Sequence, residues 1–222
     1  MAQCYTMLIF RLWNGGTLEQ WIQACHHDGS RPAIKEFQHT SGTVDQFIDN
    51  ILPICNSLLK TMIFLHSHDF IHNDLHTRNV LLHFGSKGVY AGIADWGQST
   101  PSTTQETFPK LPNFASATRA LYERDYPWTP PENISTNPPP FTKAFDVYSL
   151  SFLLKRLIGC IAEPSEAPKR EFLRNVNKHL IAGKSFNPAH RPKMWDLGLC
   201  LNGAHNVGYP IVPTFGLRPS DD

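Results

Sequence analysis

The spacing of apolar positions changes along the 222-residue chain, and each spacing predicts an element. From Thr43 to His66 apolar residues recur every three or four positions, which predicts a long buried helix with Pro53 as a local defect near its middle. Thr17 precedes a shorter pattern of the same kind and is the expected N-cap of a helix. Three more helices are expected over 145–161, 166–181 and 194–201.

Shorter apolar runs bounded by turn residues predict strands. Thr6–Trp13 ends at an Asn-Gly-Gly turn and is one such run. Asn79–Phe84 and Val89–Ala94 flank a Gly-Ser-Lys-Gly turn, so these two runs predict a β-hairpin. Gln98–Thr129 is rich in Pro, Ser and Thr, which predicts a long irregular connection. The pattern therefore predicts an α+β domain that is mainly α.

Composition narrows the possible partners. Twenty basic and nineteen acidic residues give a formal net charge of +1, so neither nucleic acid nor a membrane surface is expected as a partner. The five cysteines are widely spaced and odd in number, which fits a reduced intracellular protein, expected in the cytoplasm, better than a disulfide framework. No apolar run approaches the roughly 20 residues of a membrane helix, and the apolar start lacks the marks of a signal peptide.

Polar residues at both ends of the expected hairpin carry the candidate chemistry. His72–Asn79 reads HNDLHTRN, and Asp95 begins an Asp-Trp-Gly sequence beyond the hairpin. A carboxylate such as Asp74 can orient a hydroxyl, while Asn79 and Asp95 offer the oxygen ligands that Mg²⁺ prefers. The hairpin should bring Asn79 and Asp95 together. A surface turn with capping residues is the plain alternative, but three such groups at these spacings favour a phosphoryl-transfer site.

These pieces resemble two groups of kinases. DLHxxN and DWG are similar to sequences of aminoglycoside and choline phosphotransferases, and also to those of eukaryotic protein kinases. Three later pieces resemble the protein kinases in particular. They are the Thr129–Glu132 sequence at the end of an activation segment, the Phe145–Leu150 start of a central helix, and the Asn187–Pro192 sequence near the end of the domain.

The resemblance to protein kinases implies two internal contacts and a fold. Glu132 should pair with Arg191, and a fork of this kind is directional enough to fix a long loop. Asp146 should accept hydrogen bonds from backbone amides of the loop that carries Asp74. The implied fold is the mainly α C-terminal lobe of a protein kinase, with a small β-hairpin at the catalytic loop.

The start of the chain resembles the fifth strand and hinge of a kinase. By that resemblance Phe10 is the gatekeeper residue. The backbone of Arg11, Leu12 and Trp13 would face the adenine of ATP. Leu81 would form part of the floor beneath the base, although a core position explains Leu81 equally well.

The implied function is transfer of phosphate from ATP to a protein hydroxyl, with ATP and Mg²⁺ as cofactors and a protein as substrate or partner. Asp74 would act as the base, and Asn79 and Asp95 as the Mg²⁺ ligands. Arg78 would stabilise phosphate charge. The residue pattern does not separate serine/threonine from tyrosine specificity.

The sequence also departs from the family pattern. If Phe10 is the gatekeeper, the glycine-rich loop, the strand lysine and the helix glutamate of a kinase are missing, and Gly183–Ser185 is a plain loop because the required earlier glycine is Lys178. Residues 1–205 are therefore expected to form a truncated kinase domain, weak or inactive alone, followed by a tail over 206–222. A pseudokinase or scaffold that binds partners, and a small-molecule kinase, are the alternatives.

A second departure concerns control. Asn73 stands where kinases usually carry the arginine that receives a phosphorylated activation segment. Regulation by that route is therefore not expected.

Overall fold

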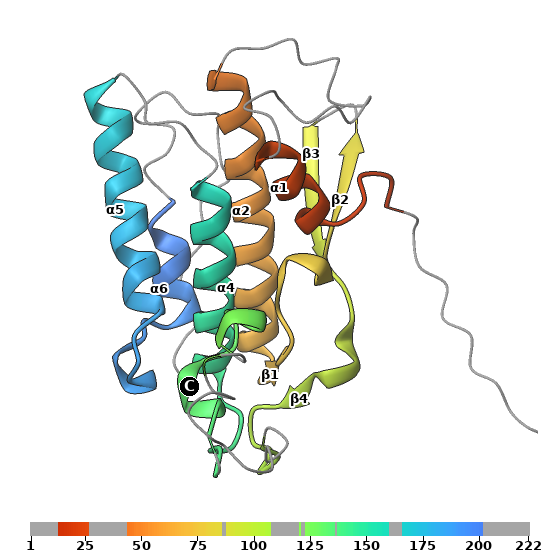
Figure 1. Cartoon of the computed structure of the whole chain (residues 1–222), viewed down its shortest axis with the longest axis vertical. Helices are drawn as coiled ribbons and strands as arrows, with labels where there is room; N and C mark the ends of the chain where they lie inside the picture. Colours follow the sequence, from red (N-terminus) through yellow and green to blue (C-terminus); the bar gives the residue numbers. More distant parts are fainter. Residues whose placement is uncertain are drawn as a thin grey trace, which may run out of the picture.

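The computed structural model describes residues 13–26, 44–85, 88–107, 120, 123–135, 137–159 and 166–201. These residues form a helical body with two small antiparallel sheets (Figure 1). The helices are α1 (Leu18–His26), α2 (Val44–Ser67), α4 (Lys143–Ile158), α5 (Ala167–Gly183) and α6 (Met194–Leu199). The strands are β1 (Phe70–Ile71), β2 (Val80–Gly85), β3 (Gly88–Ile93) and β4 (Thr100–Pro101). The predicted class, α+β and mainly α, is confirmed for this part of the chain.

Helix α2 lies at the centre and packs against β3, α4 and α6 (Figure 1). The helix runs through Pro53 without a break, so the predicted defect does not interrupt it. A proline removes one backbone donor, and the packing of its neighbours outweighs that loss. Among the side chains of α2 that the structure describes, from residue 51 onward, the fully buried ones are Ile51, Leu52, Ile54, Cys55, Leu58, Leu59 and Met62.

Helices α4, α5 and α6 complete the core and lie close to their predicted ranges. Helix α4 is buried along most of its length and packs against α2 and α5. Gly183, at the end of α5, allows this close packing because a β-carbon there would collide with the Ser151 side chain. The described helices include none that combines the length and the apolar character needed to cross a membrane.

The hairpin β2–β3 forms as predicted, with each strand shifted by one residue. Its register pairs Val80 with Ile93 and Phe84 with Val89. The start of α1 is attached to this hairpin, since the Gly15 amide donates to the Leu82 carbonyl at 2.9 Å. Figure 1 accordingly shows α1 beside β2.

Thr17 caps α1, which confirms that prediction. The Gln20 amide donates to the Thr17 hydroxyl at 3.3 Å, and the Gln20 side-chain oxygen accepts from the Thr17 amide at 2.9 Å. This reciprocal pair satisfies two backbone donors that a helix start otherwise leaves open.

The sheet β1–β4 was not predicted. Phe70 pairs with Pro101 and Ile71 with Thr100, inside the segment Gln98–Thr129 that was expected to be irregular. Two-residue strands show no periodicity, and their partners lie about thirty positions apart, so only the folded chain brings them together. Residues 108–119, 121 and 122 of that segment lie outside the described part, as do residues 27–43 and the predicted strand up to residue 12.

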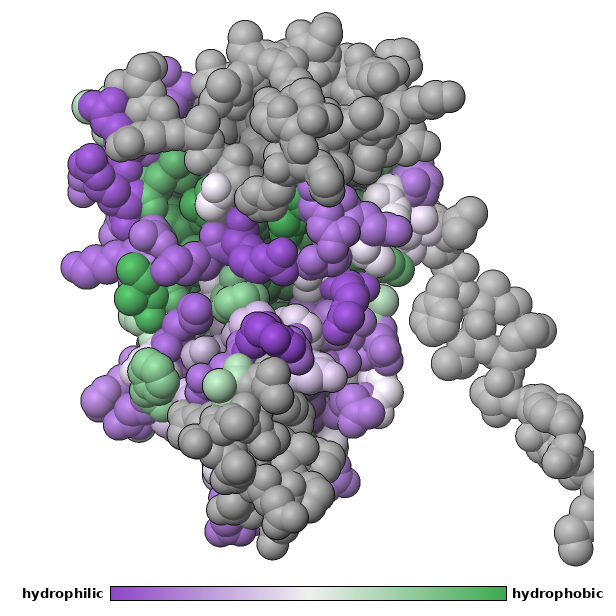
Figure 2. Space-filling view, viewed as in Figure 1, coloured by the Kyte–Doolittle hydropathy of each residue, from purple (hydrophilic) through white to green (hydrophobic). Residues whose placement is uncertain are grey.

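The surface of the described part is mostly polar on the face in Figure 2, with smaller apolar areas between the polar ones. The most exposed large apolar side chains are Phe186, Phe64 and Ile181. Single exposed apolar residues are ordinary on a soluble surface, so they do not define a site.

Candidate active site

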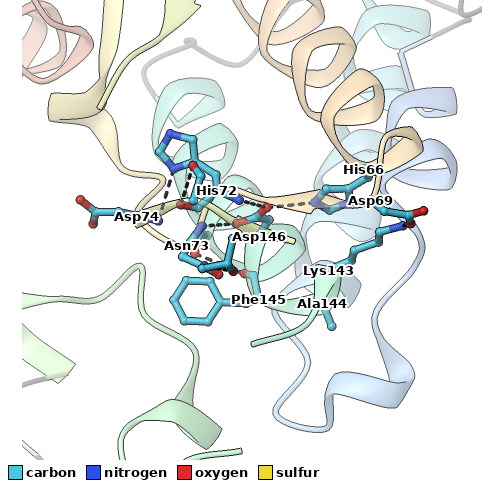
Figure 3. A network of polar contacts seen from close by, with 12 residues as sticks. His66, Asp69, His72, Asn73, Asp74, Lys143, Ala144, Phe145 and Asp146 are labelled. Carbon is cyan, nitrogen blue, oxygen red and sulfur yellow. Dashed lines mark hydrogen bonds and ion pairs between the residues drawn. The ribbon is translucent and has the colours of Figure 1, made fainter. Parts of the chain in front are cut away.

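Asp146 organises the His72–Asn79 loop from the start of α4. Its carboxylate is completely buried and accepts from the backbone amides of His72 at 2.8 Å and Asn73 at 3.0 Å (Figure 3). The His66 ring of α2 donates Nε2–H to the same carboxylate at 2.9 Å. The predicted contact between Asp146 and the amides of this loop is confirmed. A buried carboxylate with three donors fixes the loop relative to two helices.

His72 is fully buried, and its contacts define its protonation. The Asp74 amide donates to Nδ1 at 3.3 Å, so Nε2 carries the proton and donates to the Ala94 carbonyl at 3.2 Å. Burial lowers the pKa of His72, while attraction to Asp146 acts in the opposite direction. A neutral ring therefore joins the loop to the residue before Asp95.

Asn73 ties the loop to the chain beyond the hairpin. Its side-chain amide donates to the Gln98 carbonyl at 2.9 Å and to the Thr100 hydroxyl at 2.8 Å. Its backbone has a φ of 65°, a left-handed conformation that asparagine tolerates better than most residues. A neutral amide thus fills the position at which the family pattern has an arginine.

Asp74 and Asn79 are in direct contact. The Asn79 side-chain nitrogen donates to the Asp74 carbonyl at 2.9 Å and to the Asp74 carboxylate at 3.0 Å. In Figure 3 the Asp74 carboxylate points away from the Asp146 network. The Asp74 side chain is 36% exposed. The carboxylate is therefore held in place and is still reachable from solvent.

His76 lies on the other side of Asp74. Its Nδ1 accepts from the Arg78 amide at 3.2 Å, which leaves Nε2–H facing the Asp74 carboxylate at 3.5 Å. Burial acts to raise the pKa of Asp74, but hydrogen bonds from His76 and Asn79 hold that pKa below its usual range. Asp74 is therefore ionised at neutral pH and can accept a hydrogen bond from a hydroxyl.

The hairpin brings Asp95 next to Asn79, as its spacing predicted. The Ala94 amide donates to the Asn79 carbonyl at 2.8 Å, directly beyond the Val80–Ile93 pair. Asp95 follows with a φ of 61° and an exposed side chain. Two oxygen-bearing side chains thus flank the open end of the hairpin, opposite its turn.

Arg78 lies over the Trp128 ring, 5.4 Å from its centroid, and the His76 ring packs on the same indole at 4.7 Å. Within the described part, no ion pair joins Arg78 to Asp74. A cation on an aromatic face gains electrostatic attraction from the ring. The stacking therefore links the loop to the segment that precedes Glu132.

Glu132 and Arg191 form the predicted fork. The two guanidinium nitrogens of Arg191 donate to the two Glu132 oxygens at 2.6 and 2.8 Å. Arg191 also donates to the carbonyls of Ser185 at 2.8 Å and Ala144 at 3.1 Å. Its side chain is fully buried, so the pair fixes the segment before α4 to the chain before α6.

The predicted nucleotide-binding residues are only partly described. Phe10, Arg11 and Leu12 lie outside the described residues. Trp13 packs on the hairpin so closely that a β-carbon at Gly92 would collide with its indole. The Trp13 ring also meets the His83 ring edge to face, with 6.1 Å between the ring centroids. Leu81 is half-buried in β2 and pairs with Thr17.

Three contributors to the site were not found from the sequence. His66 and Thr100 act through partners distant in the chain, and the His76 ring faces Asp74 because the Arg78 amide holds its other ring nitrogen. Their polar side chains within apolar or loop segments carry no local signal of these roles. No group of three or more potential metal ligands among His, Cys, Asp and Glu occurs in the described residues.

A comparison with protein families gives the class. The model described as protein tyrosine and serine/threonine kinase matches residues 1–194. That match spans most of the chain, so the chain belongs to the protein kinase family and is a transferase by family. A search of curated proteins gave no match.

Proposed function

We propose that this chain forms the C-terminal lobe of a protein kinase over residues 1–205, with a tail over 206–222, and transfers the γ-phosphate of ATP to a protein hydroxyl. The family generally uses ATP and Mg²⁺. We also propose that the protein is intracellular and lies in the cytoplasm. Asp74 would be the base, and Asn79 and Asp95 the Mg²⁺ ligands. Trp13 and Leu81, with Phe10, Arg11 and Leu12, would border the nucleotide.

The contact between Asn79 and Asp74 carries the proposal. Both donated bonds of the Asn79 amide go to Asp74, and no described residue donates to its Oδ1 oxygen. Mg²⁺ binds a side-chain amide through its oxygen, so the Asn79 side chain presents the atom that can serve as a ligand. The bound metal would neutralise phosphate charge beside the Asp74 carboxylate.

Asp74 would accept the proton of the substrate hydroxyl. Its lowered pKa keeps it ionised, and His76 and Asn79 hold it from two sides. Arg78 lies four residues after Asp74 and is held on the Trp128 ring. In this proposal it stabilises charge on the phosphate. The sequence contains no glycine-rich loop, so the phosphotransfer activity of the chain by itself is expected to be weak.

The test is transfer of labelled γ-phosphate to a mixture of protein substrates, with the chain alone and with the chain fused to a kinase N-terminal lobe. Asp74→Asn should reduce transfer about 100-fold or more, because a positioned base is lost. Asp69→Asn is the matched control, since Asp69 is an exposed carboxylate five residues away. Equal transfer by wild type and Asp74→Asn would refute the proposal.

The same assay separates the alternatives. Wild type that is not stabilised by Mg-ATP in a thermal shift and transfers no phosphate would be a scaffold. Phosphorylation of choline or an aminoglycoside, with none of a protein, would make the chain a small-molecule kinase.

A further inference from the structure

A polar cluster beside the His72–Asn79 loop plays no part in the proposed chemistry. Thr77 of the loop donates its hydroxyl to the carboxylate of Glu19 on α1. Arg156 of α4 donates to the two oxygens of that carboxylate at 3.0 and 3.5 Å, and to the Thr77 hydroxyl oxygen at 3.5 Å. Gln23, one turn along α1, adds a fourth donor at 3.1 Å. The cluster therefore joins three segments that are distant in sequence.

Thr77 lies at the point of the loop where a fixed contact matters most. It is 4% exposed and opens the 3-10 turn Thr77–Asn79. The turn is closed by the Asn79 amide, which donates to the His76 carbonyl at 2.9 Å. A displacement of Thr77 would therefore carry Asn79 with it, and with Asn79 the contact to Asp74.

The charges of the cluster compensate each other. Burial acts to raise the pKa of Glu19, but hydrogen bonds from Thr77 and Arg156 and the charge of Arg156 hold that pKa below its usual range. The Glu19 carboxylate is therefore ionised, and both of its oxygens already accept hydrogen bonds from side chains of the protein. This favours an internal support over a binding site for a charged substrate.

Helix α1 is itself fixed at its start, just before this contact. Its start is attached to β2 through Gly15 and Gly16, and its first turn carries Glu19. Arg156 holds the same carboxylate from the last turn of α4, whose first turn carries Asp146. The loop is thus held by α4 at two places, and by α1 through Thr77.

We propose that Thr77 is a positioning residue for Asn79, held by the Glu19–Arg156 ion pair. The hydroxyl of Thr77 fixes the 3-10 turn, and the turn keeps the Asn79 oxygen where it would bind a divalent cation. The link to the cation rests on the proposed function; the link to the turn does not. Residues that orient a metal ligand from behind act on metal affinity without touching the metal.

The experiment compares Thr77→Val, which keeps the shape and removes the hydroxyl, with Thr77→Ser, which keeps the hydroxyl. For Thr77→Val the Mg²⁺ concentration that half-saturates ATP-dependent stabilisation of the purified chain should rise about tenfold, within the range typical of lost support for a metal ligand. Thr77→Ser should remain close to wild type. Gln23→Ala is the matched control, because it removes a donor to Glu19 that does not reach the loop.

Amide hydrogen exchange at Arg78 and Asn79 tests the support without any ligand. Thr77→Val and Glu19→Gln should speed exchange at these amides, while Thr77→Ser and Gln23→Ala should not. If wild type shows no Mg-ATP binding but the exchange pattern holds, the proposed function fails and the support stands. Unchanged exchange in Thr77→Val, or equal effects of the valine and serine variants, would overturn the inference.

Discussion

Replacing Arg191 with alanine is expected to lower the free energy of unfolding by about 3–5 kcal/mol, because it leaves a largely buried Glu132 carboxylate without its partner. Arg191 makes four hydrogen bonds, two to Glu132 and one each to the carbonyls of Ser185 and Ala144. Its guanidinium also lies 4.9 Å from the centroid of the Tyr148 ring. Denaturation by urea or guanidinium measures the change.

A double replacement separates the ion pair from the packing. Removing both charges with Arg191→Met and Glu132→Leu should cost less than the two single changes together, since no buried charge is then left alone. Arg124→Ala is the surface control, because Arg124 forms its ion pair with Asp125 in water, and its stability should match wild type. An Arg191→Ala chain as stable as wild type would show that the fork does not fix this segment.

Asp146→Ala should be as damaging, with a loss of about 3 kcal/mol or more, because three buried donors lose their acceptor. These donors are the amides of His72 and Asn73 and the Nε2–H of His66. Asp146→Asn should also destabilise the chain, since its NH₂ group would face an N–H donor. The loop that carries Asp74 should then be displaced, so phosphotransfer should fall with stability.

Asp69→Asn provides the comparison for Asp146. Asp69 forms an ion pair with Lys143 at 2.6 Å, close to the same helix start, but its carboxylate is exposed. The stability of Asp69→Asn should hardly change, because the ion pair is exposed and asparagine tolerates the left-handed backbone at this position, where φ is 58°. Denaturation curves and hydrogen exchange at the His72 and Asn73 amides measure both variants. Protection of these two amides in Asp146→Ala equal to that in wild type would contradict the assigned role.

Much of the fold could be predicted because the apolar residues of its helices and hairpin recur at regular spacings in the sequence. The helix α2 shows a repeat of buried positions that survives Pro53, and α4 is apolar on most faces. The hairpin β2–β3 follows from two apolar runs around a glycine turn. The sheet β1–β4 could not be predicted, since two-residue strands carry no period.

The candidate site divides in the same way. Asp74, Asn79 and Asp95 were found because they lie at fixed intervals around the hairpin, and Glu132, Asp146 and Arg191 because short motifs surround them. The position of Arg78 on Trp128 was not foreseen, because the two residues are fifty positions apart. Cation–aromatic stacking leaves no pattern in the sequence.

The sequence by itself determined the class of this protein and the candidate residues of its site, since motifs and periods are local properties of a chain. The tertiary structure alone decided how those residues are held. It put His66 on Asp146, His76 beside Asp74, and Glu19 with Arg156 on Thr77. Each of these contacts joins segments whose meeting depends on how the helices pack, and packing is a property of the whole core. The candidate chemistry of the loop from His72 to Asn79 could therefore be predicted from its sequence, whereas the contacts that hold the loop in place could not.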